Sequence, residues 1–530
     1  MKSIIIFGFL LILCPPILHS QEISDIYLNQ SLNVSINSAQ MKILDDLMVE
    51  TGRVFPVFAR PITQREWQEY VSQTLLDRTY RINDAMLERI DKYLPDFKYQ
   101  GNWHTELYGR AGLESVHRDN QNTDYITRYE ERTPLMRMGF QASRDTMFGF
   151  AIQLKLQNIW PIYTLTDNQT NLPKDVRQDL DFRMFHKAYF SYQTQRMTFQ
   201  FGRDNLSWGV GDRSTLMLSD NVPYYDFVKF VLWFTKVKFS MLYASLTDYE
   251  PQGGLNSPTQ IAKLNKPYRS MMVQRVEWNM IRSLSVGMTY TKIIFGRLPD
   301  LGDINPFIFQ HNLFKDYQNS LASIDAVWGI VPGIQMYGEL ISDEIKASND
   351  VAYDNTIGPT TVSYQGGIKA RSHGFAFVGE YVFLAPYMYD HLFTQGRAVD
   401  PDGVDYSPTK YRDITYRAIG HWLPPDSRNI YFSLGKEFTQ NISLTISAEQ
   451  RRKGEVDLLA PYPQRDTTVP ASPTGIVQQS NILGISPKFT SETFDIFGTL
   501  YLFDITNYHN IAEYRKRGWE IQAAVSCRIF

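Results

Sequence analysis

The chain has 530 residues, a length that ordinarily indicates several domains, although single β-barrels are an exception. Aromatic residues make up 14% of it while the mean hydropathy is slightly negative, a combination typical of a barrel wall in which apolar and polar residues alternate. The net charge of -3 argues against a nucleic-acid partner and against a polybasic segment that binds membrane surfaces.

The first 20 residues are predicted to be a secretory signal peptide. Lys2 supplies a positive start, the apolar run Ile4–Leu13 is too short to span a bilayer, and a plausible cleavage point lies before Gln21. A lipoprotein site at Cys14 is the alternative, but the residue before it is large. After the signal no run of apolar residues is long enough for a transmembrane helix. The chain is therefore expected to be exported as a secreted, periplasmic or outer-membrane barrel protein.

Residues 21–98 are expected to form a helical segment on the periplasmic side. Three short amphipathic helices are predicted, near residues 37–52, from Thr63 onward and at about residues 82–94. Thr63 and Glu66 have the spacing of a capping box at the start of the second helix. Short helices bury little surface on their own, so they should pack against each other and against something larger, such as the mouth of a barrel.

Residues 99–530 are predicted to form an all-β transmembrane barrel of about eighteen antiparallel strands. Phe148 to Gln157 shows the period-two alternation of apolar and polar residues that a wall between lipid and a polar lumen requires. The strands are expected to start near residues 101, 134, 147, 182, 197, 227, 237, 271, 284, 320, 334, 362, 374, 428, 442, 478, 493 and 517.

The connections between these strands alternate in length. Tight turns, such as Thr439 to Asn441, are each followed by a long loop, and the longest loop covers residues 384–427. Outer-membrane barrels have short periplasmic turns and long outer loops, and an even number of strands returns both termini to the periplasm. A soluble propeller or sandwich also explains the alternation, but it does not predict this order of loop lengths.

The stretch Phe199–Tyr225 combines a strand with a polar, Trp-bearing loop. Sugar binding needs aromatic faces that stack on rings and planar polar groups that bond hydroxyls. Candidate ligand-binding residues in this stretch are Arg203, Trp208, Arg213, Asp220, Asn221, Tyr224 and Tyr225. The alternative interpretation is that these aromatic residues form an interface girdle or pack the loop, and that Asp220 and Asn221 make a turn.

The longest loop and the lumen carry further polar and charged residues, to which no ligand is assigned. The longest loop carries several Tyr, His and Trp residues, among them His421 and Trp422. Its Asp400, Asp402 and Asp405 could supply oxygen ligands to a calcium ion, but a solvated acidic turn explains them better because no closing Glu follows at the required spacing. Charged residues expected to line the lumen are Lys155, Glu339, Glu380 and Glu449. No metal or cofactor is predicted, and the absence of hydrolase and phosphate-binding motifs argues against an enzyme.

Several of these segments resemble the Wzi-type family of capsule-assembly outer-membrane proteins. The resemblance rests on Gly202-Arg203, Trp208-Gly209-Val210-Gly211 and the run Leu216–Pro223. Arg60–Thr63 at the start of a helix is also similar, and Tyr337-Gly338-Glu339 is a weaker match. The resemblance implies an eighteen-stranded barrel with a periplasmic helical bundle that acts as a lectin and holds capsular polysaccharide at the cell surface.

The sequence therefore predicts a non-enzymatic outer-membrane lectin that binds capsular polysaccharide or exopolysaccharide and retains or assembles it at the surface. Its expected partners are that polysaccharide and outer-membrane lipid, without nucleic acid, and a monomer is expected. A porin or transport channel is the main alternative. An outer-membrane hydrolase is a third, because barrel active sites can be assembled from distant strands.

Overall fold

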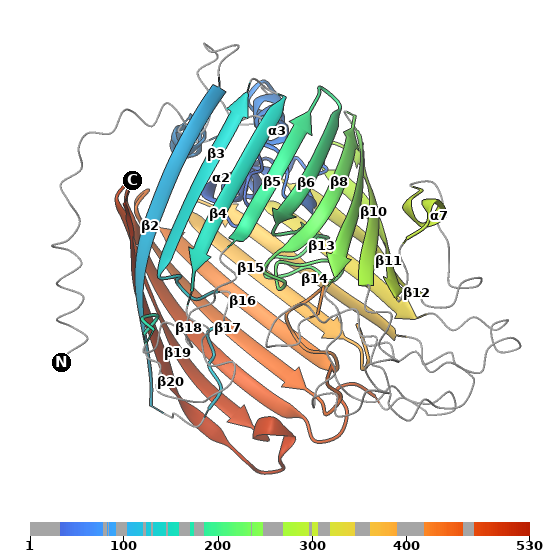
Figure 1. The fold of residues 1–530 in the computed structure, drawn as a ribbon. Coiled ribbons are helices and arrows are strands. Elements are labelled where there is room, and N and C mark those ends of the chain that lie inside the picture. Colours follow the sequence, from blue (N-terminus) through green and yellow to red (C-terminus); the bar gives the residue numbers. More distant parts are fainter. Residues whose placement is uncertain are drawn as a thin grey trace, which may run out of the picture.

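The structure is a computed structural model whose chain forms one closed barrel around an N-terminal helical segment (Figure 1). It describes residues 32–77, 82, 84–91, 103–119, 123–128, 131–144, 147–157, 170–173, 185–234, 236–246, 269–295, 299–305, 318–344, 361–389, 418–458 and 471–529. The predicted signal peptide of residues 1–20 and the acidic turn at Asp400 to Asp405 lie outside these ranges.

The wall contains eighteen antiparallel strands in the described part of the chain, as predicted. Each strand pairs with the next along the chain, and the last pairs with the first to close the ring. The strands are β2 Trp103–Arg118, β3 Met136–Arg144, β4 Phe148–Leu156, β5 Phe185–Gln193, β6 Met197–Asp204, β8 Tyr225–Trp233, β9 Val237–Leu246, β10 Arg269–Ile281, β11 Leu284–Phe295, β12 Gln318–Val331, β13 Ile334–Glu344, β14 Thr361–Ser372, β15 Phe375–Leu384, β16 Ser427–Glu437, β17 Ile442–Lys453, β18 Gln478–Thr490, β19 Phe494–Thr506 and β20 Lys516–Arg528. Two further short strands, β1 Ala59–Arg60 and β7 Ser207–Trp208, pair with each other.

The outer face of the wall is apolar because alternate residues of each strand point outward. Phe201, Met288 and Leu483 are 61%, 62% and 54% exposed there. The inward residues are mostly polar, as the alternation predicts, but β8 departs from the pattern. Its inward residues include Phe227 and Trp233, which are buried against other parts of the chain inside the ring. Part of the lumen is therefore a packed apolar core.

Three short helices precede the wall. They are α2 Ala39–Thr51, α3 Gln64–Leu75 and α4 Asp84–Asp91. Helix α3 begins with the predicted capping box, in which the Thr63 hydroxyl accepts from Glu66 N and the Glu66 carboxylate accepts from Thr63 N. Helix α2 ends at Gly52, whose φ of 68° lies in the left-handed region. The remaining helical turns are α7 Leu301–Ile304 and the 3-10 turn η5 Tyr508–Asn510.

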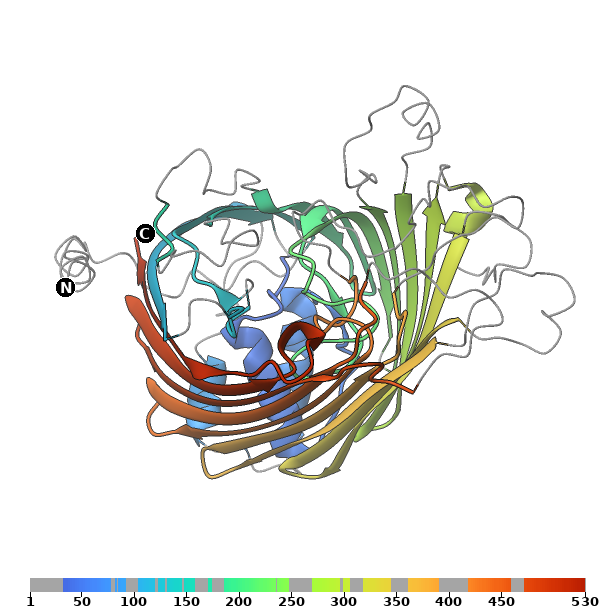
Figure 2. The same ribbon diagram turned by 90° about the horizontal axis from the view of Figure 1, so that it is seen from below.

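Helices α2 and α3 lie inside the barrel, at the end that carries the short turns (Figures 1 and 2). The Arg371 guanidinium on β14 contacts the Asp46 carboxylate of α2 at 2.8 Å. At the start of β9, close to the short turn from β8, Lys238 pairs with Glu66 of α3 at 2.8 Å. These buried ion pairs fix the helical segment to the wall, so the described residues 32–77, 82 and 84–91 form a plug.

No helix in the part of the chain that the structure describes is long and apolar enough to cross a bilayer.

Candidate functional site

The loop between β6 and β8 folds into the lumen instead of projecting from the barrel. This segment, residues 205–224, is called the inward loop here. Its strand β7 pairs with β1 of the plug, so that Trp208 lies opposite Ala59. Trp208 N also donates to Leu218 O at 2.7 Å, which closes the loop on itself. The inward loop thus joins the plug to the end of the barrel with the long loops.

Glycines allow this loop to approach the wall. Gly209 has a φ of 128°, and a Cβ atom there would lie 2.5 Å from Glu339 Oε1. At Gly211 a Cβ atom would lie 1.8 Å from the carbonyl oxygen of Ser214. Only glycine combines such a φ with so close an approach. The packing of the loop against the wall therefore explains the glycines of the Trp-Gly-Val-Gly segment without any ligand.

Two carboxylates of the wall hold the loop. Glu339 accepts from Leu216 N at 3.0 Å, and Glu380 accepts from Asp212 N at 2.8 Å. The Tyr337 hydroxyl donates to Glu380 at 2.7 Å. Glu339 and Glu380 do face the lumen, as the sequence suggests, but they bond the backbone of the inward loop. Buried carboxylates need such donors to compensate for lost hydration.

The three predicted aromatic contacts are buried. Trp208 and Tyr225 are 0% exposed and Tyr224 is 5% exposed. Trp208 and Tyr225 belong to an apolar cluster with Leu218 and Leu242 inside the barrel. Stacking on a sugar requires an accessible ring face, so this geometry favours the alternative in which these residues pack the loop.

The predicted polar residues lie in different places. Arg203 forms a bidentate pair with Asp226 on the neighbouring strand at 2.6 and 2.7 Å and covers the Tyr224 ring. Asp220 accepts from Asn37 Nδ2 at 3.0 Å, and Asn221 donates to a backbone carbonyl of residue 418 at 3.0 Å. The structure therefore does not bring the seven predicted residues together as one surface.

Arg213 lies in a different group, which combines a tryptophan with charged residues from three other segments. This arginine–tryptophan cluster consists of Arg128, Glu131, Arg213, Trp422, Glu449 and Arg451. The guanidinium carbons of the three arginines lie 4.8 Å (Arg128), 5.2 Å (Arg213) and 4.8 Å (Arg451) from the centre of the Trp422 ring. Guanidiniums over an indole face gain cation–π energy.

Carboxylates position these arginines. Glu449 contacts Arg213 at 2.9 Å and binds Arg451 through two hydrogen bonds of 2.8 Å. Glu131 pairs with Arg128 at 2.8 Å. The three guanidinium side chains are 17–22% exposed, so they are held rigidly but remain partly open to solvent. Three positive charges face two negative ones, which leaves the cluster with an excess of one positive charge.

The pKa shifts of Arg213 and His421 agree with a net positive charge of the cluster. Burial favours the neutral form of Arg213, but the Glu449 and Glu131 carboxylates outweigh it and raise its pKa. Burial, together with the Arg128 and Arg213 cations, lowers the pKa of His421 to about 3. His421 is therefore neutral at neutral pH and adds no charge. It stacks against Trp422 with ring centres 5.6 Å apart.

Two buried ring nitrogens, one in the cluster and one in the residue beside it, have no hydrogen-bond partner among the described residues. They are Trp422 Nε1 and His421 Nε2. Both atoms are enclosed by protein, so the polar groups of the cluster that remain open to solvent are its guanidiniums. Within the described residues no group of three or more His, Cys, Asp or Glu side chains could hold a metal ion. The arrangement offers planar donors, carboxylate acceptors and an indole, which is the chemistry of sugar recognition.

The comparison with protein families matches residues 136–486 to the family described as capsule assembly protein Wzi. These residues carry strands β3 to β17, the inward loop and most of β18. The chain belongs to the Wzi family. In sequence, no curated protein matches it.

The Wzi family fold is also present in a solved structure. The chain is similar to Wzi of Escherichia coli, described as an outer-membrane carbohydrate-binding β-barrel involved in group 1 capsule assembly, with a TM-score of 0.56 and 12% identity. That match covers 92% of this chain and 96% of the other. The outer-membrane channel DcaP of Acinetobacter baumannii and OccD3 of Pseudomonas aeruginosa match with TM-scores of 0.37 and 0.43, at 9% and 7% identity. They cover 82% and 80% of this chain and 99% and 91% of their own.

Sequence reasoning about this Wzi-family chain missed most of the cluster. It selected Arg213, noted Trp422 within the longest loop and assigned Glu449 to the lumen, but it did not connect them. Arg128 and Arg451 carry no local signal, because charged residues near strand ends are common in barrels. The register of the whole ring is needed to bring these segments together.

Proposed function

We propose that this chain is an outer-membrane protein that binds capsular polysaccharide or exopolysaccharide and helps to retain or assemble it at the cell surface. Membership of the Wzi family and the fold shared with a carbohydrate-binding barrel support this function. The observation that carries it is the arginine–tryptophan cluster at the end of the barrel with the long loops.

The cluster suits an acidic polysaccharide. Its guanidiniums can form paired hydrogen bonds with a carboxylate or phosphate of the sugar chain, and its carboxylates can accept from hydroxyls. The excess positive charge favours an anionic ligand over a neutral one. Burial of Trp208 and Tyr225 moves the proposed contact from the tip of the inward loop to Arg213 and its neighbours, while Asp220 and Asn221 would shape the loop.

The orientation follows from the same proposal. The long loops and the cluster face the outside, and the plug faces the periplasm. The chain acts as a monomer, by binding and without catalysis. The orientation rests on the rule that outer-membrane barrels keep their short turns in the periplasm.

The test is equilibrium binding of the detergent-purified full chain to polysaccharide extracted from its own organism, with an unrelated barrel as a control. Trp422→Ala should abolish saturable binding while the barrel stays folded. Trp328→Ala, which changes a 49% exposed tryptophan on the outer face of β12, should leave binding intact. No binding by the folded wild-type chain, or equal binding by Trp422→Ala, would contradict the proposal.

One observation favours a channel as a second candidate function. A polar cavity of about 280 Å³ lies between the start of the plug and strands β2 to β5. Glu106, Arg110, Arg137 and Lys187 are among the residues that line it. A continuous passage along this side would conduct ions, so the wild-type chain should then show conductance in a planar bilayer.

A further inference from the structure

The outer face of strands β16 to β20 changes from apolar to polar between two adjacent rows of residues. The strand register places five side chains side by side in the lower row, which comprises Phe432, Ala448, Leu483, Leu502 and Trp519. The row above it, toward the long loops, comprises Ile430, Gln450, Asn481, Asp504 and Arg517. Such a step marks where the hydrocarbon core of a bilayer ends.

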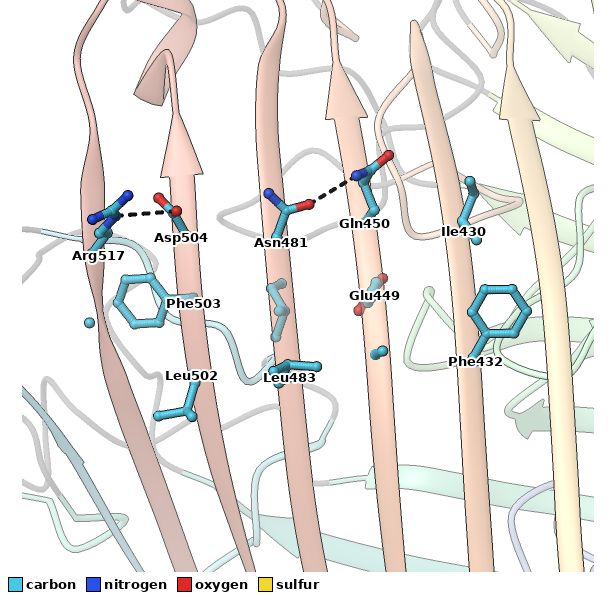
Figure 3. Close-up of a pocket in the computed structure, with 13 residues that line it drawn as sticks. Ile430, Phe432, Glu449, Gln450, Asn481, Leu483, Leu502, Phe503, Asp504 and Arg517 are labelled. Carbon is cyan, nitrogen blue, oxygen red and sulfur yellow. Dashed lines mark hydrogen bonds and ion pairs between the residues drawn. The ribbon is translucent and has the colours of Figure 1, made fainter.

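A hollow spans this boundary. Its volume is about 650 Å³, and its lining includes the residues of both rows except Trp519. Figure 3 shows Arg517, Asp504, Asn481 and Gln450 in one row across four strands, with Leu502, Leu483 and Phe432 beyond them. Ala448 contributes to the hollow, because its small side chain stands between Phe432 and Leu483, which are 50% and 54% exposed. The surface therefore offers a place for acyl chains beside a polar strip.

The polar strip is organised for a head group. Gln450 Nε2 donates to Asn481 Oδ1 at 2.9 Å, so the two amides form a pair that presents further donors and acceptors. Asp504 holds two guanidiniums, those of Arg515 and Arg517. Arg517 remains 63% exposed and Arg515 47% exposed, so most of their N–H groups can reach an anion.

The charge of this strip is positive. Arg452 is exposed in the next row toward the long loops, opposite Gln479. With Arg515 and Arg517 it makes three positive charges against the single carboxylate of Asp504. Guanidiniums pair well with phosphate oxygens, and amides pair well with sugar hydroxyls. Strands about 4.8 Å apart make the strip on β17 to β20 about 14 Å wide, which exceeds the head group of a simple phospholipid.

We infer that this surface binds one phosphorylated glycolipid of the outer leaflet, with its acyl chains over Ala448 and its phosphates on Arg515 and Arg517. The lipid then covers the hollow and joins the wall of the barrel to the surrounding leaflet. This site is outside the barrel and separate from the arginine–tryptophan cluster, so it does not depend on polysaccharide binding.

The test is native mass spectrometry of the detergent-purified full chain with diphosphoryl lipid A or with phosphatidylglycerol as the added probe. The wild type should retain lipid A in preference. The double variant Arg515→Ala/Arg517→Ala should lower the retained fraction by about tenfold or more, because two charge-assisted contacts are lost. Ala448→Phe, which fills the hollow and leaves the head-group residues in place, should lower it as well.

The matched control is Arg528→Ala, which removes an exposed arginine at the opposite end of β20 and should change nothing. Heat-modifiable gel mobility establishes that each variant is folded. Equal retention of the two lipids by the wild type would overturn the proposal. So would unchanged lipid A binding by both folded variants, or a change of oligomeric state in place of lipid loss.

Discussion

Two arginines of the cluster, Arg128 and Arg451, lie outside the inward loop. Each is held by a carboxylate and covers the same Trp422 ring. Their roles in binding are therefore similar, although they lie far apart in the sequence. A ligand that contacts the cluster should depend on both of them.

We expect Arg128→Gln and Arg451→Gln each to weaken binding of an acidic polysaccharide by about tenfold, since one charge-assisted hydrogen bond is lost. Binding of the wild type should also weaken as salt is added, because the side chains are partly exposed. Isothermal titration at two ionic strengths measures both effects. Arg282→Gln, at the end with the short turns and 70% exposed, is the matched control. An unchanged affinity in both cluster variants would exclude these arginines from the site.

His421 makes the packing beneath Trp422 sensitive to acid. Its pKa in the folded chain is about 3, below the ordinary 6.5, because burial and nearby arginines disfavour the charged form. Above pH 6.5 the residue is neutral in both folded and unfolded states, and its full contribution to stability is present. As the pH falls from 6.5 toward 3, protonation favours the unfolded segment and this contribution is lost.

Lowering the pH from neutrality to about 5.5, which is still above the pKa of an ordinary carboxylate, should therefore raise the rate of proteolysis in the segment around His421. His421→Asn keeps an acceptor for Leu423 N, which donates to His421 Nδ1 at 3.1 Å, and should flatten this pH dependence. The measurement is limited proteolysis of the folded barrel at two pH values. The same pH dependence in His421→Asn would show that another group is responsible.

At the scale of elements, the inward loop depends on its glycines. We expect Gly209→Ala to release the loop from the wall, because the new Cβ atom meets Glu339 and the φ of 128° is unfavourable for alanine. Cleavage within residues 205–224 by an added protease should increase about tenfold, for a local loss of about 1–3 kcal/mol. Gly338→Ala is the control, since its Cβ atom would lie an ordinary 3.6 Å from Gln365 O. Equal protection of the two variants would mean that the loop is held elsewhere.

The elements themselves could be predicted from sequence, since period-two alternation and turn residues are local signals. Predicted strand starts agree with the structure within about three residues, as for β5, expected near 182 and found at Phe185. The capping box of α3 was equally local. Packing of the loop by Trp208 was one of the two interpretations of the sequence, but its position inside the barrel could not be predicted, because a loop with polar residues and glycines normally lies at the surface. Its place depends on pairing with β1, more than a hundred residues away.

At the scale of the whole molecule, the plug and the inward loop together obstruct the lumen. We expect low conductance from the wild type in a planar bilayer and a large, steady conductance after deletion of residues 37–95. The deletion removes helices α2, α3 and α4 and the strand that pairs with the inward loop. A folded deletion variant that stays silent would show that the loops alone close the barrel.

The pairing of β1 with β7 also decides where a pulling force goes. If polysaccharide bound at Arg213 is dragged away from the cell, tension enters the inward loop. Part of it passes through the hydrogen bonds of Leu216 and Asp212 into wall strands β13 and β15. The rest crosses β7 and β1 to the plug, whose Asp46 is fastened to Arg371 near the opposite rim. The load is thereby shared over the depth of the barrel, and the anchorage of a long surface polymer does not depend on a single loop.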